Sequence, residues 1–209
     1  LENSNLGQTQ IAAGLKEALQ QGIDKQVVNL TKTDGFYNNS LVRIALPSEL
    51  QKVEKTLRDV GLGSLADEGI KAMNKAASNA VKEATPIFVN AITSMTISDA
   101  TNILMGDKNA ATQYLVKSTK TSLYNKFNPV IKSSFTKVGA DKVWNNIITK
   151  YNALPLVKKV NPDLTDHVTQ QALTGVFTMI EKEEANIRTN VSARSTNILK
   201  SVFAMQDKK

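Results

Sequence analysis

Apolar residues recur every three or four positions along almost the whole chain, which is the spacing of one buried face on an α-helix. In the first such run, from about Thr9 to Leu30, charged and amide side chains fall on the opposite face. The apolar stripe of this run consists of Ile11, Leu15, Leu19, Ile23, Val27 and Leu30. Similar runs follow as far as Met205. The pattern therefore predicts an all-α fold, a compact bundle of about eight or nine helices with no substantial β-sheet.

Several positions carry signals for helix ends. Thr96 and Asp99 lie three residues apart and match a capping box. Ser64 and Asp141 are predicted to cap the helices that follow them, because short polar side chains accept hydrogen bonds from first-turn amides. Pro129 is predicted to begin a new helix, since proline fits a first turn and interrupts a helix interior.

The stretch from Asp34 to Pro47 departs from the helical pattern. Asp-Gly and Asn-Asn pairs favour a turn at its start, and residues 41–46 are the one piece that reads as extended. No long linker, low-complexity tract or internal repeat interrupts the chain. We therefore expect one all-α domain over residues 1–209, with two lobes divided near residue 106 as the alternative.

The residue types that most catalytic and metal sites need are scarce. The chain has no cysteine, which excludes disulfide bonds and thiolate metal sites, and it has one histidine, His167. His167 follows Asp166 at the start of a predicted helix and is interpreted either as a general base or as a surface or capping residue. The sequence predicts no catalytic residue, no metal site and no cofactor.

One acidic cluster, in residues 181–184, has helical spacing. Glu181 and Glu184 share a helix face, and Arg188 lies four residues beyond Glu184 on that face. Carboxylates at this spacing occur in helix-bundle metal sites, but those sites also use a Glu-x-x-His element that this chain lacks. The pattern favours Glu–Arg pairing along the helix.

The net charge of +7 is unevenly distributed. The excess lies mostly between Lys108 and Lys159, where every basic residue is lysine. Lysine is a strongly hydrated point charge, whereas arginine is the usual reader of bases and phosphates. This Lys-rich 108–159 face is interpreted as a solvated surface, with binding to nucleic acid or to another anionic surface as the alternative.

The four arginines lie in motifs that look ordered, whereas most other bases are lysines. We hypothesise that arginines and acidic residues meet in one buried or half-buried network, which either binds a ligand or stabilises the fold. The candidates are Asp34, Arg43, Asp99, Asp166, Glu181, Glu184, Arg188 and Arg194. The expected function is a binding module for an apolar or anionic ligand or a partner protein. A carboxylate-dependent periplasmic hydrolase is the alternative, and it needs two carboxyl groups that face a cleft.

Short strings, in one order along most of the chain, resemble those of a known family. They include Asp34-Gly35-Phe36 with Val42-Arg43-Ile44-Ala45-Leu46-Pro47, Ala72-Met73-Asn74-Lys75-Ala76-Ala77, Met95-Thr96-Ile97-Ser98-Asp99-Ala100, and Leu164-Thr165-Asp166-His167-Val168. On these strings the chain resembles a bacterial family of exported all-α proteins that is classed as a domain of unknown function and often described as lipoproteins.

The resemblance implies a location in the periplasm or at the outer membrane. The expected partner is an unidentified ligand or an envelope protein, and the sequence does not favour nucleic acid. Peripheral membrane association through a lipid-bearing cysteine upstream of residue 1 is a further expectation from the family. The resemblance brings no catalytic or binding residues, so none is assigned from it.

Overall fold

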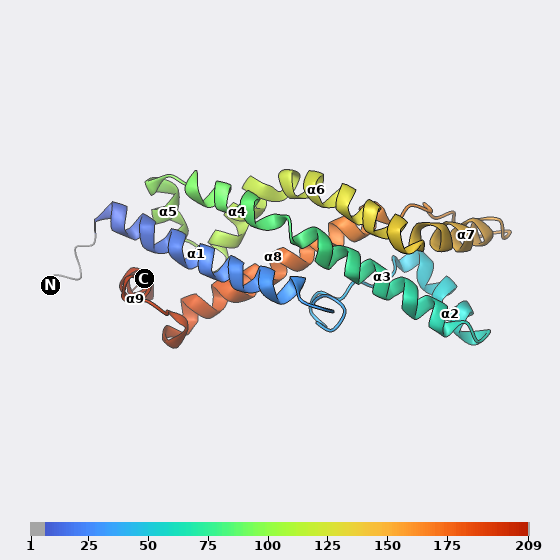
Figure 1. Cartoon of the computed structure of the whole chain (residues 1–209). Coiled ribbons are helices and arrows are strands. Elements are labelled where there is room, and N and C mark those ends of the chain that lie inside the picture. Colours follow the sequence, from blue (N-terminus) through green and yellow to red (C-terminus); the bar gives the residue numbers. More distant parts are fainter. Residues whose placement is uncertain (1–6, 209) are drawn as a thin grey trace. The chain divides into compact units, whose positions relative to one another are not determined.

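The computed structural model of the chain describes residues 7–208. Over these residues it contains nine α-helices and no β-strand, which confirms the predicted all-α bundle. The helices, labelled in Figure 1, are α1 (Gln8–Thr31), α2 (Gln51–Asp59), α3 (Gly63–Val81), α4 (Ala84–Thr93), α5 (Ile97–Leu104), α6 (Ala110–Val138), α7 (Ala140–Asn152), α8 (Thr165–Thr189) and α9 (Asn197–Asp207). None of these helices is both long and apolar enough to span a bilayer.

The contacts divide the chain into two compact units. Unit 1 contains the residues up to Asn29, Ala84–Leu123 and the residues from Val176 onward, whereas unit 2 contains Leu30–Glu83 and Tyr124–Gly175. Each unit combines segments that are distant in sequence, and the division runs within α1, α6 and α8. One domain over residues 1–209 stays a prediction, and its first six residues and its last residue lie outside the described part.

The core of unit 1 is built from apolar side chains of several helices. The rings of Phe88 on α4 and Phe177 on α8 meet edge to face, with centroids 6.1 Å apart. Gly14 on α1 lies directly against the side chain of Val202 on α9, where any β-carbon would collide with it. The absence of a side chain at Gly14 therefore lets α1 and α9 approach closely.

The core of unit 2 is centred on one tryptophan. Trp144 on α7 is 2% exposed and covers Gly69 on α3. A β-carbon at residue 69 would lie 2.6 Å from Cε2 of the indole, which is closer than real β-carbons approach. Phe36 lies against Gly175 on α8 in a similar way, with its Cε1 atom 2.9 Å from the place of a β-carbon. Glycines on α3 and α8 thus make room for two aromatic rings of this core.

The segment predicted to be extended begins in a turn at Leu41 and Val42, and residues 43–47 have no regular secondary structure; Val42, Ile44 and Leu46 are buried. No strand pairs with this segment within the described residues, and the side chain of Asn74 on α3 takes that role. Asn74 Oδ1 accepts a hydrogen bond from the Ile44 amide at 2.8 Å, and its Nδ2 donates to the Ile44 carbonyl at 3.0 Å. Both backbone polar groups of the buried residue Ile44 are therefore satisfied by one side chain.

The predicted helix break at Pro129 is wrong, because α6 runs through this residue. The proline ring is exposed, and the turns on either side of it bury Phe127 and Ile131 completely. Proline removes one backbone hydrogen bond from a helix interior. The apolar contacts of the flanking turns keep α6 continuous in spite of that loss.

The predicted caps at Ser64 and Asp141 are also displaced. α3 already begins at Gly63, so Ser64 lies inside the helix, and Leu62 is the residue before it. α7 follows Gly139, which has a φ of 71° and ends α6 in the left-handed conformation. Asp141 lies in the first turn of α7, where its carboxylate accepts from the Lys142 amide at 2.9 Å.

Candidate functional site

A buried ion pair on α8 is the centre of the predicted network. Glu184 and Arg188 are 7% and 6% exposed, and Arg188 Nε donates to Glu184 Oε2 at 2.9 Å. Both residues belong to unit 1. A charged pair at this depth is retained only when hydrogen bonds satisfy its remaining polar atoms. The additional hydrogen bonds of Glu184 and Arg188 go mainly to backbone groups at two helix ends.

Glu184 caps the first turn of α6. Its two carboxylate oxygens accept from the backbone amides of Ala111 and Thr112, at 2.9 and 2.8 Å, and from the Thr112 hydroxyl at 2.7 Å. These amides belong to the first turn, which has no partners within its own helix. A negative charge at a helix N-terminus also interacts favourably with the helix dipole. With the bond from Arg188, the carboxylate accepts four hydrogen bonds, which fills its capacity.

Arg188 caps the C-terminal end of α5, where it donates to backbone carbonyl groups. Its two terminal nitrogens donate to the carbonyls of Ile103 and Leu104, at 2.8 and 3.0 Å. These carbonyls close the last turn of α5, where a positive charge is favoured. One ion pair on α8 therefore stabilises the end of one helix and the beginning of the next.

Arg194 extends the network to the end of α8. Its Nε and Nη2 atoms donate to the carbonyls of Ile187 and Arg188, at 2.9 and 3.1 Å. Its other bonds go to the Asp207 carboxylate on α9, at 2.7 and 3.0 Å. This guanidinium holds the pKa of Asp207 below its usual range. The three residues Glu184, Arg188 and Arg194 are thus brought together, and they serve as caps of helix ends.

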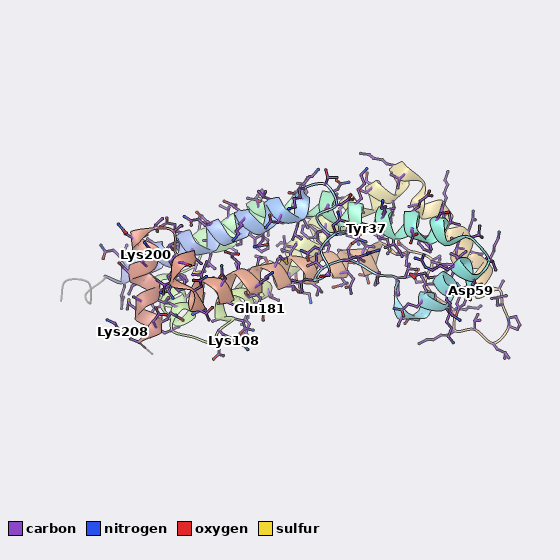
Figure 2. The ribbon with its side chains drawn as sticks, turned by 90° about the horizontal axis from the view of Figure 1, so that it is seen from below. Tyr37, Asp59, Lys108, Glu181, Lys200 and Lys208 are labelled. Carbon is purple, nitrogen blue, oxygen red and sulfur yellow. The ribbon has the colours of Figure 1, made fainter. Side chains whose placement is uncertain are left out.

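The other two candidates of unit 1 lie apart from these bonds. Asp99 forms the predicted capping box with Thr96, which is confirmed, at 3.0 and 3.1 Å. Burial and the nearby Asp99 carboxylate also raise the pKa of Tyr114. Glu181 is exposed on α8 (Figure 2) and forms no ion pair with a described residue.

Three candidates belong to unit 2 and make their contacts there. Asp34 is exposed and has a φ of 56°, so it forms the left-handed position of the turn after α1. Arg43 is exposed, and its guanidinium lies 4.1 Å from the centre of the Tyr37 ring. Asp166 accepts a hydrogen bond from the Tyr124 hydroxyl at 2.6 Å, which raises the pKa of that hydroxyl.

His167 has a structural contact in unit 2. Its Nε2 atom lies 2.8 Å from the carbonyl oxygen of Ala45, so this nitrogen carries the proton and donates to the segment of residues 43–47. With Asn74, it holds residues 44 and 45 against α3 and α8. His167 therefore makes a structural contact, and the choice between a general base and a surface or capping residue stays a prediction.

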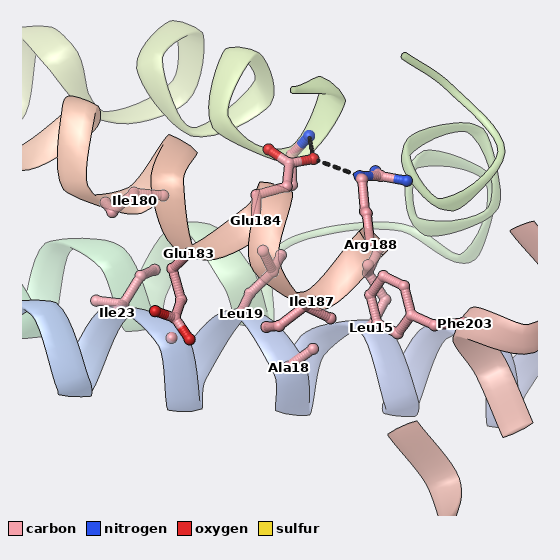
Figure 3. A pocket seen from close by; sticks show the side chains of 12 residues that line it. Leu15, Ala18, Leu19, Ile23, Ile180, Glu183, Glu184, Ile187, Arg188 and Phe203 are labelled. Carbon is pink, nitrogen blue, oxygen red and sulfur yellow. Dashed lines mark hydrogen bonds and ion pairs between the residues drawn. The ribbon is translucent and has the colours of Figure 1, made fainter. Parts of the chain in front are cut away.

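A narrow apolar crevice lies in unit 1 below the buried ion pair (Figure 3). α1 contributes Leu15, Leu19 and Ile23 to its wall, and α8 contributes Ile187. The free space is about 20 Å³, which is room for roughly one water molecule. The crevice is therefore a packing defect of the core rather than a preformed ligand cavity.

Two neighbouring carboxylates border this crevice but point to different helices. Figure 3 shows Glu183 directed toward α1 and Glu184 directed toward α6. Glu183 lies 3.3 Å from the Lys25 ammonium and accepts from Gln26 Nε2 at 3.0 Å. Each carboxylate is held by its own donors. They do not face each other across a cleft as the acid and base of a hydrolase must.

The Lys-rich 108–159 face has a different character. All ten of its lysines are exposed, and none forms an ion pair with a described residue. The part of it in unit 2, residues 124–159, contains seven lysines and one acidic residue, Asp141. Unlike the arginines of the network, these charges make no internal bonds that would account for their positions.

Lysines also line a groove between α3 and α6, within unit 2. Two adjoining hollows of about 530 and 220 Å³ share Asn79, Ser134 and Lys137. Lys82 borders the first hollow and Lys75 the second. Lys75 on α3 and Lys82 directly after it were not among the predicted candidates, although their spacing of seven residues places them on one side of the helix. The groove combines three positive charges with hydroxyl and amide groups, which is the chemistry of an anion-binding surface.

Comparisons with known proteins identify the family of this chain but no activity. Neither the curated proteins nor the solved structures include a significant match to this chain. A family described as a protein of unknown function, DUF4197, matches residues 5–204. Because that match covers nearly the whole sequence, the chain belongs to the DUF4197 family.

Proposed function

We propose that this protein binds an anionic membrane surface in the cell envelope through the lysines of unit 2. The observation that carries the proposal is the set of seven exposed lysines in residues 124–159, accompanied there by one acidic residue. Each lysine close to an anionic bilayer contributes about 1 kcal/mol of attraction. Several such charges together are enough for reversible association.

A membrane surface fits these charges better than nucleic acid does. All basic residues between Lys108 and Lys159 are lysines, whereas arginine, with its planar fork of donors, is the more usual reader of bases and phosphates. Aromatic platforms for stacking bases are also missing from the groove, whose apolar lining is Ala72, Ala76, Pro129, Val130 and Val138. Point charges on flexible stems suit a fluid array of lipid phosphates.

The test is co-sedimentation of the full chain with vesicles. We expect binding to vesicles that contain phosphatidylglycerol and no binding to pure phosphatidylcholine. Binding should fall steeply with added salt, because the screening length drops from about 10 Å at 0.1 M to about 3 Å at 1 M. Replacement of Lys126, Lys132 and Lys137 by glutamine should weaken binding about tenfold or more.

A matched control removes the same charge elsewhere. Lys182, Lys200 and Lys208 are exposed lysines of unit 1 outside the 108–159 segment, and their replacement by glutamine should leave vesicle binding within about twofold. Equal loss in both triple variants would show a response to net charge only and would refute the proposed surface. Binding to duplex DNA or RNA without binding to vesicles would also refute it.

The proposed location is the periplasm or the outer membrane. The family resemblance and the lack of cysteine, which avoids mispaired thiols in an oxidising compartment, support it. Fractionation of the native host into cytoplasm, periplasm and membranes tests the location, and recovery of the protein in the cytoplasm would contradict it.

A further inference from the structure

The loop between α7 and α8 exposes apolar side chains. Leu154 is 55% exposed and Leu156 is 106% exposed, with Pro155, also exposed, between them. Single exposed leucines are ordinary on protein surfaces, but adjoining ones at a loop tip form a patch. Nothing in unit 2 covers these side chains.

The fold holds this tip outward. The side chain of Asn152 closes the neck of the loop, donating to the Val160 carbonyl and accepting from the Val160 amide, both at 2.8 Å. Residues 153–159 are therefore a closed loop of fixed span rather than a free linker. Leu156 has a φ of 65°, a left-handed conformation that a leucine adopts only at an energetic cost.

The charges beside the tip are all of one sign. Lys150 precedes the loop, and Lys158 and Lys159 follow its apolar residues. All three are exposed, and no acidic residue occurs between Asp141 and Asp163. Apolar side chains flanked by lysines are the pattern of interfacial anchors. The apolar part enters the acyl boundary of a bilayer while the ammonium groups remain at the phosphates.

From these observations we infer that Leu154, Pro155 and Leu156 form a membrane-insertion tip for bilayers with anionic phospholipids. The inference deepens the proposed function and depends on it, since the lysines would bring the loop to the surface that the leucines enter. The lysine flank selects an anionic bilayer over an uncharged apolar pocket, because burying those charges without counter-charges would oppose docking.

A probe at the tip tests insertion directly. The chain has no cysteine, so Leu156→Cys accepts a single environment-sensitive fluorophore such as NBD. On phosphatidylglycerol vesicles, we expect its emission to rise several-fold and shift to the blue, and lipid-borne quenchers in the shallow acyl region should quench it. A label at Ser40→Cys, an exposed position outside the loop, should not respond. An unresponsive tip label on protein that binds the vesicles would overturn the inference.

A paired variant separates insertion from electrostatic binding. Leu154→Ser with Leu156→Ser should weaken vesicle binding at least about tenfold, because burial of one leucine is worth about that factor. Its dependence on salt should match that of the unchanged protein, since no charge is altered. If the unchanged protein fails to bind anionic vesicles, the proposed function is refuted. If it binds and the variant binds equally well, only the insertion tip is refuted. A lipid-free dimer that the variant converts to monomer would assign the tip to a second copy and overturn the inference.

Discussion

Removal of the Glu184 charge should destabilise the protein severely. In Glu184→Gln, the amide group that replaces one carboxylate oxygen is a donor, and it meets donors from α6 or Arg188 in a buried site. The guanidinium of Arg188 also loses its only charged partner among the described residues while it stays 6% exposed. The substitution changes no apolar packing, so its effect measures the polar bonds.

The structure sets the expected magnitude. Breaking one side of a buried ion pair costs about 3–5 kcal/mol, because the other charge stays buried without compensation. Four hydrogen bonds end on this carboxylate, and each bond to a charged group is worth about 1.5–3 kcal/mol when taken alone. The bonds are not additive, so we expect a loss of about 3–5 kcal/mol. That is a large share of the roughly 5–15 kcal/mol by which domains are stable.

Urea unfolding followed by far-ultraviolet circular dichroism measures this loss. Glu181→Gln is the matched control, because Glu181 is one turn earlier on α8 and exposed, so its replacement should change stability by less than about 0.5 kcal/mol. The same urea dependence in both variants would show that unfolding exposes similar surface. A loss below about 1 kcal/mol in Glu184→Gln would refute the assignment of Glu184 as a buried helix cap.

Three further predictions concern other parts of the fold. Gly69→Ala should lower the free energy of unfolding by about 1–3 kcal/mol, because the new methyl group collides with Trp144, and it should alter the indole fluorescence. An unchanged melting temperature would contradict the tight packing. Asn74→Ala should lower the free energy of unfolding by about 2–4 kcal/mol and speed hydrogen exchange of the Ile44 amide. Slow exchange of this amide in the variant would contradict its hydrogen bond to Asn74. Asp207→Asn should cost about 1 kcal/mol or less at neutral pH, because the carboxylate is partly exposed. Since the folded pKa of Asp207 is lowered, its contribution is present above the ordinary value of 3.8 and is lost as the pH falls through the lowered pKa. The two proteins should therefore converge in stability in acid, and a gap that widens there would contradict the pair.

The helices were predictable because apolar spacing repeats locally. The capping box at Thr96 and Asp99 could be read for the same reason, since both partners lie within one turn. Pro129 misled the prediction because proline rules describe an isolated helix, whereas α6 is held by buried residues on both sides of the ring. Local rules therefore identify the elements and fail where packing overrides them.

The candidate sites were only partly predictable. The spacing of Glu184 and Arg188 indicated their pairing, but the helix ends that they cap lie 72 to 85 residues earlier in the chain, and no local pattern points to them. The outward position of Leu156 was also invisible in the sequence, because an apolar loop residue is as often buried as exposed. The bond from Asn152 to Val160 determines that outcome, and it depends on the fold of the loop.

The dependence of α5 and α6 on α8 has a consequence for synthesis. The last turn of α5 and the first turn of α6 emerge from the ribosome long before residues 184 and 188 are translated. Until then, the amides of Ala111 and Thr112 and the carbonyl of Leu104 lack the side chains that bond them in the folded protein. Unit 1 therefore matures late, and a nascent chain that ends before Glu184 lacks the side chains that close both helix ends.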